Sequence, residues 1–131
     1  MTAEQHARVL ECLAPFRPVV IYLFGSQAEG RGRPESDVDL AFLSPHDCSP
    51  GALEVFTTAQ RLAEIVNRDV DLVDLAAAST VMRKEVVRTG RILHESDRKA
   101  RQEFEMYTLS DYARLNTERR PVLEALGYAA K

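Results

Sequence analysis

The sequence has no tryptophan and only two cysteines in its 131 residues, Cys12 and Cys48. Two separated cysteines with no CxxC pair exclude a disulfide scaffold and a cysteine-based metal site, and they are typical of free thiols in a reducing compartment. No apolar run approaches the ~18 residues that cross a bilayer, and residues 1–13 lack the apolar core of a signal peptide. We therefore expect a cytoplasmic protein without a membrane segment.

The chain also lacks an excess of positive charge. The chain has 17 Lys and Arg against 20 Asp and Glu, a net charge of −3. Broad nucleic-acid binding depends on neutralising many phosphates, and aromatic residues, at 7% of the chain, leave little for a base-stacking surface. We expect no direct nucleic-acid binding.

Apolar patterning predicts one domain in which helices and strands alternate. Predicted helices cover 3–14, 50–67, 80–89 and most of 96–127, and predicted strands cover 19–24, 37–43, 70–75 and 91–94. This order predicts a mixed sheet of about four strands flanked by helices, an α/β or α+β fold. We expect a single domain over 1–131, with a core at about 1–95 and a C-terminal helical segment at about 96–131.

Several local features predict how these helices begin, end and pack. Ser49 is the expected N-cap of the helix at 50–67, Gly90 is expected to end the helix at 80–89 as its C′ residue, and Pro121 is expected to kink or split the last helix. The expected packing positions of the second and last helices are Leu53, Phe56, Ala59, Ala63 and Val66, and Phe104, Tyr107, Tyr112 and Leu115.

A glycine-rich loop follows the first predicted strand. Gly25 and Ser26 come directly after the apolar run 19–24. Glycine lets the backbone approach a ligand closely because it has no Cβ, and backbone amides at such a position bind anions. The Ser26 hydroxyl can also donate to a phosphate oxygen. We interpret this segment as a phosphate-binding loop.

Two carboxylates open the second predicted strand. Asp37 and Asp39 come after ten residues that separate them from Ser26, and their i, i+2 spacing on a strand places both on one face, with Cα atoms ~6.5–7 Å apart. Carboxylates that share a site repel unless a cation relieves them, and beside a phosphate-binding loop they suit Mg²⁺. A third carboxylate would complete a two-metal site. The third predicted strand offers Asp71 and Asp74 on opposite faces, and alternation does not choose between them.

The combination resembles the signature of minimal nucleotidyltransferases of the polymerase β superfamily, which is Gly-Ser, ten residues, then Asp-x-Asp. The matching positions here are 25–26 and 37–39. The resemblance implies the small nucleotidyltransferase α/β core and ATP as substrate, and it selects Asp71 over Asp74 as the third carboxylate. It further implies a catalytic, two-Mg²⁺-binding set of Asp37, Asp39 and Asp71, and a phosphate-binding pair of Gly25 and Ser26.

The loop departs from many relatives of this kind, which carry arginines where this sequence has Gln27 and Glu29. Arg31 and Arg33 are the remaining loop cations. We therefore take Arg31 and Arg33 as candidate contacts to the triphosphate.

The C-terminal segment resembles the last helix of bacterial antitoxins in this family, around Phe104-Glu105 and Tyr112–Leu115. Those antitoxins are paired with HEPN ribonuclease toxins and are similar to enzymes that transfer AMP from ATP to a tyrosine of the toxin. The resemblance implies a Mg²⁺-dependent adenylyltransferase antitoxin with a HEPN toxin as partner. Two alternatives stay open: an antitoxin that neutralises its partner by binding alone, and a nucleotidyltransferase acting on a small molecule such as an aminoglycoside.

Overall fold

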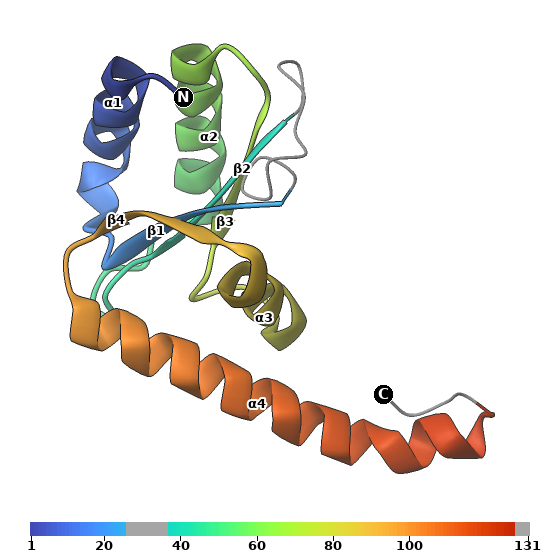
Figure 1. Ribbon diagram of the computed structural model, residues 1–131. Helices are drawn as coiled ribbons and strands as arrows, with labels where there is room; N and C mark the ends of the chain where they lie inside the picture. The colour runs from blue at the N-terminus through green and yellow to red at the C-terminus, as the bar shows by residue number, and fades with distance from the viewer. Residues whose placement is uncertain (26–36, 128–131) are drawn as a thin grey trace.

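The computed structural model describes residues 1–25 and 37–127. Within them a single four-stranded sheet is formed in the order β3-β2-β1-β4 (Figure 1). Strand β1 is antiparallel to both β2 and β4, whereas β2 and β3 are parallel. The expected mixed sheet is confirmed, and its strands are β1 (Val20–Phe24), β2 (Val38–Leu43), β3 (Val70–Asp74) and β4 (Arg91–Glu95).

Helices cover both faces of this sheet (Figure 1). On one face lie α1 (Ala3–Leu13), which continues into a short 3₁₀ turn η1 (Ala14–Phe16), and α2 (Ala52–Val66). On the other face lie α3 (Thr80–Thr89) and the long α4 (Arg98–Ala125). No helix in these two stretches of the chain combines the length and apolar character needed to span a membrane.

Strand β1 is buried along its whole length, as its continuous apolar run predicts. Ile21 and Leu23 belong to the core beneath α1 and α2, which also contains Leu62 of α2. Tyr22 and Phe24 belong to the opposite core, beneath α3 and α4, which also contains Val86 of α3 and is joined by Phe104 of α4. Alternate side chains of β1 therefore belong to two separate cores, one on each face of the sheet.

The buried face of α2 differs from the expected one. Leu53 and Phe56 are exposed, while Leu62 and Val66 are buried. Leu53 lies nine positions before Leu62, which is two and a half helical turns, so the two side chains point about 180° apart. The apolar stripe predicted from the sequence coincides only partly with the face of α2 that packs against the sheet. The N-cap is Gly51, not Ser49, because the helix begins later than expected.

The structure differs in part from two expectations about helix ends. Helix α4 is continuous through Pro121, because the proline lies in an exposed stretch where water can bond the carbonyl oxygen that it leaves unpaired. Helix α3 ends at Thr89 with Gly90 next, as expected, but Gly90 has φ −76° and does not adopt the left-handed conformation of a C′ glycine. A Cβ at Gly90 would overlap with the Val86 carbonyl oxygen and would also lie 3.1 Å from Cδ1 of the Tyr22 ring.

The C-terminal helix packs through fewer of the expected positions. Phe104 contacts the core under α3, and the Lys84 Nζ atom lies 4.6 Å from the centre of the Tyr112 ring. Tyr107 is exposed, contrary to expectation. Thr108 is instead the buried residue of α4, because the face of α4 toward α3 passes through Phe104, Thr108 and Tyr112.

Candidate active site

Strand pairing gathers the candidate residues at one end of the sheet. Asp39 pairs in register with Asp71 across the parallel β2 and β3 strands. Asp39 also pairs with Phe24, the last residue of β1, so Gly25 follows at the same end. Asp37 directly precedes β2. Strands β1, β2 and β3 thus bring Gly25 and Asp71, which are 46 positions apart in the sequence, to the same end of the sheet.

Asp39 and Asp71 face the side of the sheet that α3 and α4 cover. Leu40 belongs to the core on the α1/α2 side, and Ala41 to the core on the other side. Alternation therefore places Asp39 with Ala41. By the same argument Asp71 shares this face with Val73, which packs against the same core.

Asp74 lies on the opposite face of β3 by the same alternation. Its Oδ1 accepts a hydrogen bond of 3.0 Å from the backbone N–H of Ala76, so it stabilises the turn that follows β3. Its register partner is Phe42, at the other end of β2. The structure therefore separates the two aspartates that alternation leaves open, and places Asp71 beside Asp39.

Gly25 packs its backbone directly against the Asp39 carboxylate. It has φ +73°, a left-handed conformation that favours glycine. A Cβ added at this position would overlap with the Asp39 carboxylate, Oδ2 first. Glycine is thus required here for two independent reasons, its conformation and the close approach of an aspartate.

The surroundings of Asp39 disfavour an ionised carboxylate that has no cation beside it. Burial raises the pKa of Asp39, and the nearby negative charges of Asp71 and Asp37 raise it further. A divalent cation would remove this repulsion, and three carboxylates are the hard oxygen donors that Mg²⁺ accepts. The donor chemistry therefore fits Mg²⁺.

The side chains do not converge fully in their present conformations. Over residues 1–25 and 37–127, no three His, Cys, Asp or Glu side chains are close enough to hold a metal ion together. Asp37 is exposed at the edge of the described segment. The backbone register nevertheless places Asp39 and Asp71 side by side on neighbouring strands. A change of side-chain rotamer, without movement of the backbone, therefore alters the distance between their carboxylate oxygens. The remaining loop positions of interest lie outside the described residues: Ser26, Gln27, Glu29, Arg31 and Arg33.

A hydrogen-bonded network supports β1 behind the site. The buried Tyr22 hydroxyl donates to Glu105 Oε2 at 2.7 Å. Arg101 donates to Glu105 Oε1 at 2.6 Å and to Glu95 Oε1 at 2.9 Å. Burial, then the bond to Glu105, raises the pKa of Tyr22 above its ordinary range. The sequence carries no signal for this link, because Tyr22 and Glu105 are 83 positions apart.

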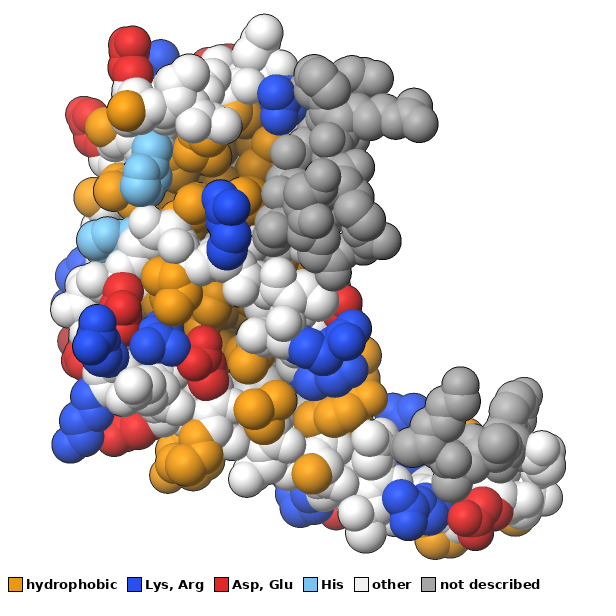
Figure 2. Space-filling model, in the orientation of Figure 1, with side chains coloured by type: hydrophobic (Ala, Val, Ile, Leu, Met, Phe, Trp, Pro, Cys, Tyr) orange, Lys and Arg blue, Asp and Glu red, His pale blue; other side chains and the backbone are white. Residues whose placement is uncertain are grey.

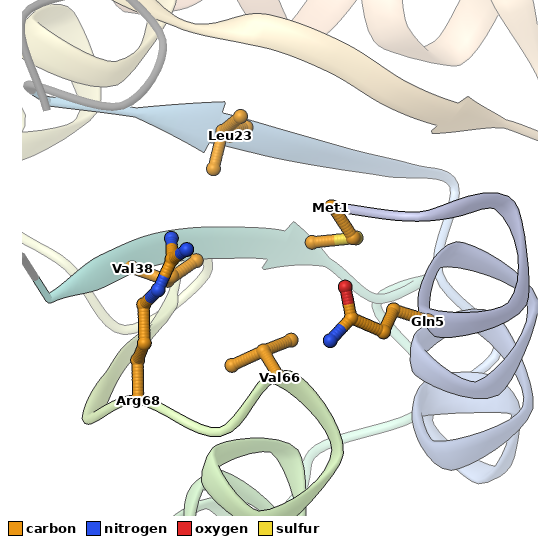
Figure 3. A pocket seen from close by; sticks show the side chains of 6 residues that line it. All are labelled: Met1, Gln5, Leu23, Val38, Val66 and Arg68. Atoms are coloured by element: carbon orange, nitrogen blue, oxygen red, sulfur yellow. The ribbon is translucent and has the colours of Figure 1, made fainter. Parts of the chain in front are cut away.

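A small cavity lies at the same end of the sheet but on the opposite face (Figure 3). Leu23 and Val38 form part of its lining, together with the side chains of Met1, Gln5, Val66 and Arg68. Its volume is about 50 Å³, well below the ~300 Å³ of a small-ligand pocket. Because Val38 and Asp39 point to opposite faces, this cavity is separate from the carboxylates.

Comparison with known proteins gives a consistent result. Residues 10–99 match the family model described as polymerase beta, nucleotidyltransferase. The chain is 37% identical over 105 residues to the protein adenylyltransferase MntA of Shewanella oneidensis, a match that covers 80% of this chain and 73% of that relative.

Solved structures agree with the sequence comparison. A chain in the crystal structure of a toxin–antitoxin with AMP-PNP superposes with a TM-score of 0.81 at 32% identity, covering 92% of this chain and 97% of that one. A chain in the complex of the tri-AMPylated Shewanella oneidensis HEPN toxin with its MNT antitoxin gives 0.79 at 30% identity, covering 96% and 98%. The chain therefore belongs to the polymerase β nucleotidyltransferase family.

Proposed function

We propose that this protein is a Mg²⁺-dependent adenylyltransferase that transfers AMP from ATP to a hydroxyl of a HEPN-type ribonuclease toxin, and so acts as its antitoxin. The observation that carries the proposal is the register pairing of Asp39 with Asp71 beside Gly25. The named relatives support it, since one is a protein adenylyltransferase and another was solved with an AMPylated toxin.

Each residue of the site has a role in this reaction. Asp37, Asp39 and Asp71 would hold Mg²⁺, which when bound neutralises phosphate charge and lowers the pKa of the attacking hydroxyl. Gly25 lets the backbone approach the triphosphate closely, and Ser26, with Arg31 and Arg33, would contact its oxygens. In this chain, positioning and electrostatics supply most of the rate, as in phosphoryl transfer generally.

The transfer step is an in-line displacement at the α-phosphorus of ATP. The acceptor oxygen, which we assign to a tyrosine of the toxin, forms a bond to the α-phosphorus, and the bond from this phosphorus to the oxygen bridging to the β-phosphate breaks. Pyrophosphate leaves, and the hydroxyl proton passes to the Asp71 carboxylate as general base. The use of ATP and the two free cysteines, Cys12 and Cys48, are consistent with a cytoplasmic location.

The test uses α-³²P-labelled ATP with Mg²⁺, the purified protein and the product of the neighbouring gene. Label on that product, lost in Asp37→Asn while the variant stays folded, is the expected result. A stable complex without label would instead favour an antitoxin that neutralises by binding alone. That second function has one observation in its favour, the presence of Gln27 and Glu29 where many relatives carry arginine.

A further inference from the structure

Helix α4 is much longer than the sheet that it crosses. It starts near the end of the sheet opposite the carboxylates, where Ser96 donates its backbone N–H to Val19. Its 28 residues span ~42 Å at 1.5 Å per residue, whereas a five-residue strand spans ~17 Å. The helix therefore passes under α3 and continues beyond the domain on the side where β1 ends and β2 begins (Figure 1). We call residues 115–126 the α4 arm.

The face of α4 that packs on α3 continues along the arm. Thr108 is 3% exposed and marks the centre of the buried face. At about 100° per residue, Leu115, Val122 and Leu126 all lie within about 40° of Thr108 around the helix. Val122 is 61% exposed and Leu126 68% exposed. We call Leu115, Val122 and Leu126 the arm seam. The arm seam is half-buried at Leu115 and exposed at Val122 and Leu126. The exposed Arg119 lies on the same face, about 20° from Thr108, so the surface is an apolar stripe that carries one arginine.

The direction of the arm seam is set by the contacts that precede it. Phe104 packs against the core below α3, and Lys84 of α3 lies over Tyr112. The seam continues this side of the helix, so it faces the side of the sheet on which Asp39 and Asp71 lie. Figure 2 shows α4 projecting beyond the rest of the described molecule. A body resting on the seam would lie in the angle between the arm and the carboxylate end of the sheet.

We propose that the arm seam is the docking surface for the protein acceptor, and that it holds the acceptor hydroxyl toward the carboxylates. This inference rests on the proposed function. A transferase that modifies a protein must seat its substrate on the face that carries the metal ligands, and the arm seam is a largely apolar surface, with Arg119 beside it, on that face. The matching chains of the toxin–antitoxin structures span 92% and 96% of this chain, so their similarity extends into the arm.

A second copy of this chain is the disfavoured occupant. Two copies paired through their arm seams would each fill the angle next to the other's carboxylates, where the acceptor must enter. Such a pair would exclude the substrate from both sites. An acceptor protein bound to the arm seam would instead bring its own hydroxyl next to the carboxylates.

Two substitutions of matched exposure test the proposal. Val122→Asp places a charge in the arm seam. Met106→Asp places the same charge on the outer side of α4, about 160° from Thr108, at a residue that is 60% exposed. Because both residues are exposed in the isolated chain, both variants should keep the wild-type melting temperature. Binding to the product of the neighbouring gene is measured by calorimetry, and label transfer from α-³²P-ATP is measured in parallel.

We expect Val122→Asp to weaken the complex at least tenfold and to slow labelling in proportion at subsaturating partner, while Met106→Asp changes either by less than twofold. Equal binding by the two variants, or self-association of the wild type that Val122→Asp abolishes, would overturn the proposal. Asp37→Asn should bind its partner normally and transfer no label. A seam-dependent complex without label from the wild type would refute the transferase function and leave the docking surface intact.

Discussion

Asp39 and Asp71 occupy paired positions on two neighbouring parallel strands, and each carboxylate lies within the field of the other. Packing Gly25 against Asp39 adds to the cost, because it removes water from one side of the carboxylate. The protein without a bound cation thus carries a local concentration of negative charge that favours unfolding. This concentration is the feature that suits the site to a divalent cation and to the phosphates that accompany it.

Replacing Asp39 should stabilise the protein while abolishing its activity. The pKa of Asp39 is raised in the folded state, by burial first and by Asp71 and Asp37 next. The folded protein therefore binds more protons than the unfolded chain between the unfolded and folded pKa values, and stability falls as pH rises through that window. At pH 7 we expect Asp39→Asn to melt about 1–3 °C higher than wild type, with no AMP transfer.

The pH dependence distinguishes this explanation from a general effect of the substitution. Below the unfolded pKa of an aspartate, about 3.9, Asp39 is protonated in both states, so the advantage of the asparagine should vanish. Added Mg²⁺ should raise the melting temperature of the wild type, because it binds the folded state, and leave that of Asp39→Asn nearly unchanged. A variant that is less stable than wild type at pH 7 would contradict the raised pKa.

Asp71 and Asp74 form a natural pair for testing the third carboxylate. Asp71 lies beside Asp39, whereas Asp74 points to the other face and accepts a hydrogen bond from the Ala76 N–H. Asp71→Asn should reduce the initial rate of label transfer by about a thousandfold, in the range that loss of a general base and of a metal ligand together explains. Asp74→Asn keeps a carbonyl acceptor for Ala76, so its rate should stay within about threefold of wild type. Similar rates for the two variants would show that Asp71 has no special role.

Comparison with Gly127 separates the two reasons why position 25 requires glycine, which are its backbone conformation and its close approach to Asp39. Both have positive φ, +73° and +87°, but a Cβ at Gly127 meets nothing within 4 Å, whereas at Gly25 it meets the Asp39 carboxylate. Gly127→Ala should therefore cost about 1–2 kcal/mol, from backbone conformation alone. Gly25→Ala should cost at least that much and also displace Asp39, so transfer should fall by about a hundredfold or more. Urea unfolding and labelling rates measure the two effects, and a fully active Gly25→Ala would exclude the close approach as a requirement.

The strands could be predicted from the sequence because their signals are local. A continuous apolar run indicated β1, and alternation indicated that Val38 and Leu40 face one way and the two aspartates the other. The spacing of Gly25, Asp37 and Asp39 predicts phosphate and metal chemistry, and the register of β1 against β2 places Gly25 and Asp39 at the same end of the sheet. These features depend on positions a few residues apart, where strand geometry permits few alternatives.

The features that could not be predicted depend on partners that are distant in the chain. The stripe through Leu53 and Phe56 is a valid helical pattern, but which side of α2 meets the sheet is decided by where Leu62 lands against β1 and β2. The choice of Asp71 over Asp74 likewise needed the register of β2 against β3, or the family resemblance in its place. Tyr107 was expected to pack because it is aromatic, and only the position of α3 shows that Thr108 takes that place.

The hydrogen bond between Tyr22 and Glu105 should contribute measurably to stability. The buried hydroxyl donates to a carboxylate that also accepts from Arg101, and hydrogen bonds to charged groups are worth about 1.5–3 kcal/mol. Glu105 is partly accessible to water, which can replace some of this bond, so Tyr22→Phe should lower the free energy of unfolding by about 1–2 kcal/mol. Tyr107→Phe is the matched control, since Tyr107 is 66% exposed and loses a hydroxyl that water already solvates. Urea unfolding at pH 7 measures both, and equal stability of the two variants would show that the link from β1 to α4 adds nothing.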